Sequence, residues 1–155
     1  MSKVAGQEAT GANTATATPR HVVIVGFGLS GRAATNSIIE HGISYAVIEA
    51  NPETVSRCEK GGLHIINGDA RHPAILRQAG IERATDVFVT LPSDKATLEV
   101  VEQARQLAPN AKIIARCTFV SGGMEATRRG ADDVVVAEQV VAAEFGRVTA
   151  AILDR

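Results

Sequence analysis

Short apolar runs alternate with longer amphipathic segments along most of this chain. The apolar runs are rich in Val and Ile and several end at a glycine or a polar turn, a pattern typical of buried strands. They occupy residues 21–25, 44–48, 63–66, 85–90, 112–115 and 133–136. The segments between them carry helix signals, such as Asn51-Pro52 at a start and Gly130 at an end. These segments predict helices over residues 29–40, 52–60, 73–79, 95–108, 121–129 and 138–153.

The alternation of strand and helix predicts an α/β fold, a doubly wound, six-stranded parallel sheet of Rossmann type. Right-handed crossovers give the expected strand order 3-2-1-4-5-6. This unit accounts for residues 20–155, and we expect one domain there. Residues 1–19 are mainly Ala, Thr, Gly and Ser, with Val4 as their only large aliphatic residue besides Met1. They cannot bury enough apolar surface to offset the entropy of ordering, which predicts a flexible tail or linker.

A glycine-spaced turn follows the first predicted strand. It consists of Gly26, Phe27, Gly28, Leu29, Ser30 and Gly31. In this G-x-G-x-x-G spacing the first glycine makes the turn, the second lets the backbone approach a phosphate, and the third lets the helix pack on the strand. Glu49 ends the second strand 23 positions after Gly26 (49 − 26), close to the roughly 20 expected for a carboxylate that binds a ribose hydroxyl. The sequence therefore predicts a nucleotide-binding βαβ unit; a turn without a ligand is the alternative.

Ligands of such sheets lie beyond the carboxyl ends of the strands. The loops there supply the remaining candidates: Ala50, Asn51, Asp69, Ala70, Thr90, Leu91 and Arg116. Asp69 would reach the base or the ribose, unless it serves as a helix cap or a loop hydrogen-bond acceptor. Arg116 would contact an anionic group, unless it forms a structural salt bridge. Thr90 either binds the ligand or simply ends its strand.

Composition narrows the class of protein. The chain has 155 residues, 16 Lys and Arg against 17 Asp and Glu, and a formal net charge of −1, so nothing in its charge favours nucleic acid as a partner. We find no apolar run of the roughly 18 residues that a membrane span needs, nor the apolar core of a signal peptide. The two cysteines, Cys58 and Cys117, form no metal-binding pattern, and the four histidines lack partners at ligand spacing. We expect a cytoplasmic protein without a metal site.

An NAD-dependent oxidoreductase fragment is the competing interpretation. A dehydrogenase needs a region that binds and orients its substrate, and the predicted sheet uses all of residues 20–155. Catalysis within the nucleotide fold resembles short-chain dehydrogenases, which use Tyr-x-x-x-Lys. The only tyrosine here is Tyr45, and Glu49 stands four positions later. We therefore favour a binding and regulatory function over catalysis.

The motifs resemble a known family, the RCK, KTN or TrkA-N regulatory domain of K+ transport proteins. The matching stretches are VVIVGFGLSG (22–31), VIEANPE (47–53), NGDARHPAILRQAGIERATDVFVTLPSD (67–94), IIAR (113–116) and RRGADDVV (128–135). Within the family, the chain is most similar to the lobes of Kef-type K+/H+ antiporters. Two positions differ from common family residues: Asn51 replaces a second acid, and Thr118 replaces the second Arg of the Kef-type pattern.

The resemblance implies a ligand-sensing module rather than an enzyme. Such lobes bind NAD(H), AMP, ADP or ATP and assemble as dimers or rings at the cytoplasmic face of a membrane channel or transporter. The implied partners of this chain are thus an adenine nucleotide, a K+ channel or cation/proton antiporter, and further copies of itself.

The last predicted helix carries an apolar stripe. Val141, Phe145, Val148 and Ile152 recur at steps of four, three and four, which places them on one face. Such a stripe either covers the sheet as ordinary core or contacts another copy of the chain. Because the family pairs its lobes near this point, we expect a homodimer or a higher ring.

Overall fold

The computed structural model describes residues 18–155; residues 1–17, most of the expected flexible segment, lie outside the described part. One sheet of six parallel strands, in the order β3-β2-β1-β4-β5-β6, forms the centre of the described part. The strands are β1 (His21–Val25), β2 (Ser44–Glu49), β3 (Ile65–Asn67), β4 (Asp86–Val89), β5 (Lys112–Cys117) and β6 (Asp133–Val136). The predicted fold class and strand order are confirmed.

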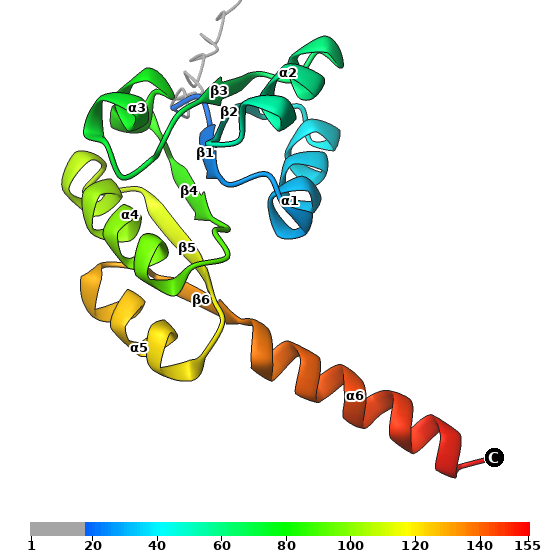
Figure 1. Cartoon of the computed structure of the whole chain (residues 1–155). Helices are drawn as coiled ribbons and strands as arrows, with labels where there is room; N and C mark the ends of the chain where they lie inside the picture. Colours follow the sequence, from blue (N-terminus) through cyan, green and yellow to red (C-terminus); the bar gives the residue numbers. More distant parts are fainter. Residues whose placement is uncertain (1–17) are drawn as a thin grey trace, which may run out of the picture.

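Helices pack on both faces of this sheet (Figure 1). The packed helices are α1 (Leu29–Glu40), α2 (Pro52–Lys60), α3 (Pro73–Gln78), α4 (Asp94–Leu107) and α5 (Val120–Arg129), with a short 3₁₀ helix η1 (Ile81–Arg83). A sixth helix, α6 (Ala137–Leu153), follows β6. α1 and α2 cover one face, where Ile38 and Val55 join Val22 and Ile24 of β1. α3, α4 and α5 cover the other face. β1 lies between the two cores and is buried throughout, which explains its continuous apolar sequence.

Several boundaries differ from the prediction for local reasons. The third strand begins at Ile65 rather than residue 63, because the Leu63 N–H still donates to the Cys58 carbonyl in the turn that ends α2. The fifth strand continues to Cys117, since it pairs with β6 as far as Val136. α4 begins one residue early because the Ser93 hydroxyl accepts a hydrogen bond from the Ala96 N–H. η1 was not predicted, and Gly80 opens it with φ +80°.

α6 leaves the body of the molecule instead of folding back on the sheet (Figure 1). None of its residues is buried, and Phe145 is 74% exposed. The interpretation that its apolar stripe covers the sheet of its own chain is therefore wrong. On the face that carries α1 and α2, the sheet is consequently uncovered over β5 and β6, where Val135 is 49% exposed. Within residues 18–155, no helix is long and apolar enough to cross a membrane.

Arg105 joins α4 to the amino ends of β5 and β6, an interaction that the sequence did not reveal. Its guanidinium donates to the carbonyls of Gly130, Ala111 and Pro109 at 2.8–3.1 Å. It also forms a 2.8 Å ion pair with Asp132, whose carboxylate accepts the Ile113 N–H at 2.7 Å. One side chain thus satisfies several backbone acceptors that connect three elements.

Replacing Arg105 should destabilise the fold. We expect Arg105→Ala to lower the free energy of unfolding by about 2–3 kcal/mol, because part-buried carbonyls and a carboxylate lose their donor. Urea denaturation would measure this as a lower midpoint. Arg147→Ala is the matched control, since Arg147 is exposed on α6 and, within residues 18–155, pairs only with Glu144. Equal midpoints for the two variants would contradict the structural importance of Arg105.

Candidate functional site

A cleft of about 520 Å³ opens at the carboxyl ends of the central strands. Most of the sequence-predicted residues line it: Gly26, Phe27, Gly28, Leu29, Ser30, Glu49, Asn51, Thr90, Leu91 and Arg116. A smaller adjoining pocket shares Gly26, Glu49 and Leu91 with the cleft and adds Ala50, Asp69 and Ala70. Only Gly31 among the predicted residues lines neither. The structure therefore gathers the candidates at one place, and their contact with a ligand stays a prediction.

The glycine turn is shaped by close backbone contacts. Gly26 has φ +95°, and its N–H donates to the Ile48 carbonyl of β2 at 2.9 Å. Gly31 lies directly against the Gly26 carbonyl, and a Cβ there would collide with that oxygen. Gly28 differs, because a Cβ at this position would meet no atom within 4 Å. The turn therefore leaves open space in front of the first turn of α1, where free N–H groups favour an anion.

Glu49 connects the turn to the second strand. One carboxylate oxygen accepts the Phe27 N–H at 2.9 Å, and the other accepts the Asn51 N–H at 2.9 Å. Each oxygen keeps a further lone pair that can accept a hydroxyl proton. The Asn51 side chain caps α2 by accepting from the Glu53 and Thr54 N–H groups. Two backbone donors thus fix Glu49 in the cleft at the position expected for a ribose-binding acid.

Thr90 holds the glycine turn through its side-chain hydroxyl. Its hydroxyl lies 2.9 Å from the Val25 carbonyl and 3.1 Å from the Gly26 carbonyl. The same side chain is also the nearest neighbour that a Cβ on Gly26 would meet. Thr90 lines the cleft, but its hydroxyl proton is already used by the turn.

Arg116 brings a positive charge to the lining of the cleft. Its guanidinium makes long contacts with the carbonyls of Leu91 and Pro92, at 3.3 and 3.4 Å. No carboxylate of residues 18–155 forms an ion pair with it, so the salt bridge considered from the sequence is not what the structure shows. A guanidinium held by carbonyl groups keeps its charge available for a phosphate.

Asp69 is held by Arg71, a residue that the sequence did not single out. The Arg71 guanidinium pairs with both carboxylate oxygens at 2.7–3.1 Å, and the Arg71 N–H donates to one of them at 2.9 Å. These side-chain hydrogen bonds lower the pKa of Asp69 to about 2. The loop hydrogen-bond alternative for Asp69 is therefore the arrangement present here.

Several other side chains serve packing. Cys117 is fully buried, and this burial raises the pKa of its thiol. His21 is buried between the Ser44 hydroxyl and the Ala79 carbonyl, and its burial lowers the imidazole pKa.

Thr54 and Pro92 line the cleft although the sequence did not suggest them. Thr54 follows the cap of α2 by three positions, so its helical register could have indicated it.

A model of the TrkA-N domain family matches residues 22–137. The chain belongs to the TrkA-N domain family. This match extends from β1 to the first residue of α6, so most of α6 lies beyond it.

Curated relatives of this TrkA-N domain are much longer membrane transport proteins. It is 30% identical over 122 residues to the putative cation/proton antiporter YbaL of Escherichia coli, covering 79% of this chain and 22% of YbaL. It is 25% identical over 128 residues to the glutathione-regulated potassium-efflux protein KefC of Klebsiella pneumoniae, covering 83% of this chain and 21% of KefC. The chain thus spans about a fifth of these relatives.

Solved structures agree with this assignment. The TrkA-N domain of E. coli YbaL superposes with a TM-score of 0.79 at 28% identity, covering 83% of this chain and 96% of that one. The GsuK channel bound to NAD gives a TM-score of 0.74 at 27% identity, covering 83% of this chain and 23% of that one. GsuK bound to ADP gives a TM-score of 0.75 at 28% identity, and the match covers 86% of this chain and 35% of that one. The resemblance found in the sequence motifs is confirmed.

Two glycines of the turn should respond differently to substitution. We expect Gly28→Val to fold normally and to lose at least about tenfold in nucleotide affinity, because its side chain enters open space where a phosphate would approach. Gly31→Val should instead lose about 3 kcal/mol of stability or fail to fold, because the new side chain meets the Gly26 carbonyl. Thermal melting and calorimetry with NAD and ADP would measure both effects. A folded Gly28→Val protein with unchanged nucleotide affinity would contradict the assignment of a nucleotide site to this turn.

Proposed function

We propose that this chain is a nucleotide-sensing regulatory lobe that controls a K+ channel or a cation/proton antiporter. The observation that carries the proposal is the Glu49 carboxylate, fixed by the Phe27 and Asn51 N–H groups beside an open glycine turn. This arrangement presents a ribose acceptor and a phosphate site side by side. The similar transport proteins, YbaL and KefC, support a membrane transporter as the partner. Such a lobe would act at the cytoplasmic face of the membrane.

The ligand class is an adenine nucleotide, NAD(H) or AMP, ADP or ATP. The cleft offers Glu49 for the ribose, the N-terminus of α1 for a phosphate, and Arg116 for a further negative charge. The GsuK structures with NAD and ADP support both dinucleotide and mononucleotide ligands. Regulation then follows from linkage: a ligand that prefers one arrangement of the assembly shifts the transporter by the same free energy, typically about 1–3 kcal/mol.

Calorimetry of the chain with NAD, NADH, AMP, ADP and ATP tests the proposal directly. Binding of at least one of them is expected, and no binding at millimolar concentration would refute the nucleotide-sensing function. An NAD-dependent oxidoreductase would consume NADH in a mixture with crude metabolites. Loss of the reduced cofactor's absorbance in that mixture would favour the enzyme interpretation instead.

A 2′-phosphate should be rejected by the cleft. The Glu49 carboxylate would lie about 4 Å from it, and two like charges at this distance repel by about 4 kcal/mol at an effective dielectric constant near 20, before screening by salt. We expect NADPH to bind at least about tenfold more weakly than NADH, as measured by calorimetry at low salt. Glu49→Gln should narrow this difference because it removes the charge and keeps the shape. Tighter binding of NADPH by the unmodified protein would contradict the assignment of Glu49.

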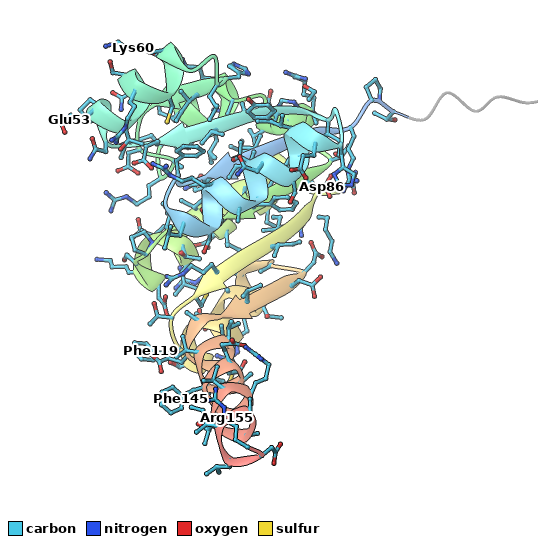
Figure 2. All side chains as sticks on the ribbon, turned by 90° about the vertical axis from the view of Figure 1, so that its right-hand side faces the viewer. Glu53, Lys60, Asp86, Phe119, Phe145 and Arg155 are labelled. Carbon is cyan, nitrogen blue, oxygen red and sulfur yellow. The ribbon has the colours of Figure 1, made fainter. Side chains whose placement is uncertain are left out.

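We further propose that the lobe works as a homodimer or a higher ring through α6. Figure 2 shows Phe145 on the projecting helix, clear of the sheet and on the same side of the molecule as Phe119. The rest of the stripe is also exposed, with Val141 at 61% and Ile152 at 55%. Nothing in the described part of the chain buries this stripe, and an exposed apolar stripe of this kind is typical of an interface.

The uncovered part of the sheet supports the same proposal. A cavity of about 220 Å³ on this face is lined by Phe88, Ile114 and Val135 from three neighbouring strands, together with Ala34 of α1. Parallel sheets are normally covered on both faces. A second copy has the complementary element, since its own α6 has no buried residue. A nucleotide in each cleft could then alter the angle between the paired lobes and act on the transporter.

Disrupting the stripe should weaken self-association. Light scattering across a concentration series should show dimers or larger assemblies of the unmodified chain, and Phe145→Glu should shift it toward monomer because a charge would enter an apolar contact. Ala143→Glu is the matched control, since it adds the same charge on the side of α6 nearly opposite to Phe145, two positions or about 200° around the helix axis. A strict monomer at high concentration, or equal behaviour of both variants, would contradict an interface at the stripe.

A further inference from the structure

Asp69 lies in the small pocket that adjoins the cleft, and its backbone is firmly positioned. The Gly68 N–H donates to the Glu49 carbonyl at 3.0 Å, and the Asn67 side chain donates to the carbonyls of Glu49 and Ala50. The loop after β3 is therefore tied to the end of β2. Asp69 and Glu49 line the same small pocket beside the glycine turn. A base or ribose bound there would lie within reach of both side chains.

Arg71 engages both oxygens of the Asp69 carboxylate. One oxygen accepts the Arg71 backbone N–H at 2.9 Å, and the other accepts Nη2 at 2.7 Å. The single Nε–H is shared between the two oxygens, at 3.1 and 3.0 Å. Three donor hydrogens thus use most of the carboxylate's lone-pair sites, of which there are about four. A ligand that donates a hydrogen bond to Asp69 must compete with Arg71 for these sites.

The same guanidinium has a second acidic neighbour. Its Nη1 lies 3.9 Å from a carboxylate oxygen of Glu99 on α4. The Arg71 side chain is 49% exposed and that of Glu99 is 38% exposed, so the guanidinium can change partners without crossing the core. Exposed ion pairs contribute little net free energy, so moving the Arg71 guanidinium from Asp69 to Glu99 costs little free energy.

We propose that Arg71 competes with the nucleotide for Asp69, and so sets the affinity of the cleft for ligands that donate a hydrogen bond there. The donor is an N–H or O–H group, supplied by the adenine amine or by a ribose hydroxyl. Binding displaces the Arg71 guanidinium from Asp69 toward Glu99, which connects occupation of the cleft to α4. Arg71 acts through Asp69 and is thus a positioning residue. This inference rests on the proposed nucleotide-binding function.

Calorimetry with AMP tests the competition. We expect Arg71→Ala to bind AMP about two- to fivefold more tightly than the unmodified chain, the range for breaking an exposed ion pair. Asp69→Asn should weaken binding, and adding Arg71→Ala to Asp69→Asn should bring no gain. Arg77→Ala is the control for net charge, because Arg77 is an exposed arginine on α3 that pairs with Glu82. It should leave the affinity unchanged.

A comparison with purine riboside 5′-monophosphate identifies the donor, because its base has only a hydrogen where adenine has its amine. If Arg71→Ala strengthens the binding of AMP alone, the donor is the adenine amine. If it strengthens the binding of both nucleotides, the donor is a ribose hydroxyl. Both results support the competition.

Weaker or unchanged binding by Arg71→Ala, or a gain that persists alongside Asp69→Asn, would overturn the competition. Weaker binding would mean that Arg71 neutralises the cleft instead. These outcomes differ from failure of the proposed function, in which the unmodified chain binds none of the adenine nucleotides.

Discussion

The arrangement of the cleft depends on how closely α1 approaches the end of β1. Gly31 lies against the Gly26 carbonyl with no room for a side chain between them. This contact fixes the start of α1 and leaves its first N–H groups facing open space. It also turns the Phe27 N–H toward Glu49, which it reaches at 2.9 Å. The open start of α1 and the fixed position of the Glu49 carboxylate, which we propose as the phosphate site and the ribose acceptor, are thus two consequences of one backbone contact. The positive φ of Gly26 makes that contact possible.

The sequence predicted the fold well because each element is marked by local chemistry. β-branched runs between glycines and prolines predicted six strands, and the Rossmann-type pattern predicted the strand order 3-2-1-4-5-6, which the structure confirms. Errors occurred where hydrogen bonds that the apolar pattern does not record decide a boundary. Residues 63 and 64 were predicted to lie in a strand, but the Leu63 N–H donates to the Cys58 carbonyl in the turn that ends α2, and pairing with β2 begins at Ile65. For α6, periodicity gave the helix and its stripe but could not say what the stripe contacts, because a period defines a face and not a partner.

Within the candidate site, the positions were predictable and the hydrogen bonds were not. The carboxyl ends of parallel strands must meet at one edge, so the loops after five strands could be placed together from the sequence alone. Which acceptors are already occupied depends on side-chain geometry. Asp69 and Arg71 are two positions apart, and no spacing rule indicates that one arginine engages both oxygens of the carboxylate. Similarly, only the structure shows that the Thr90 hydroxyl is used by the turn, while Arg116 retains its charge.

The cleft and the uncovered face of the sheet are not independent surfaces. Ser30, Thr90 and Arg116 line both the cleft and the apolar cavity over β4, β5 and β6. Among residues 18–155, Arg116 is held only by long contacts to two carbonyls, so a phosphate in the cleft can draw its guanidinium toward the glycine turn. In the proposed dimer, the same movement changes the surface on which the second copy rests. Linkage then requires the reverse effect: assembly must change nucleotide affinity by the same factor by which the nucleotide changes assembly. Because the two surfaces share side chains, this coupling needs no long pathway through the fold.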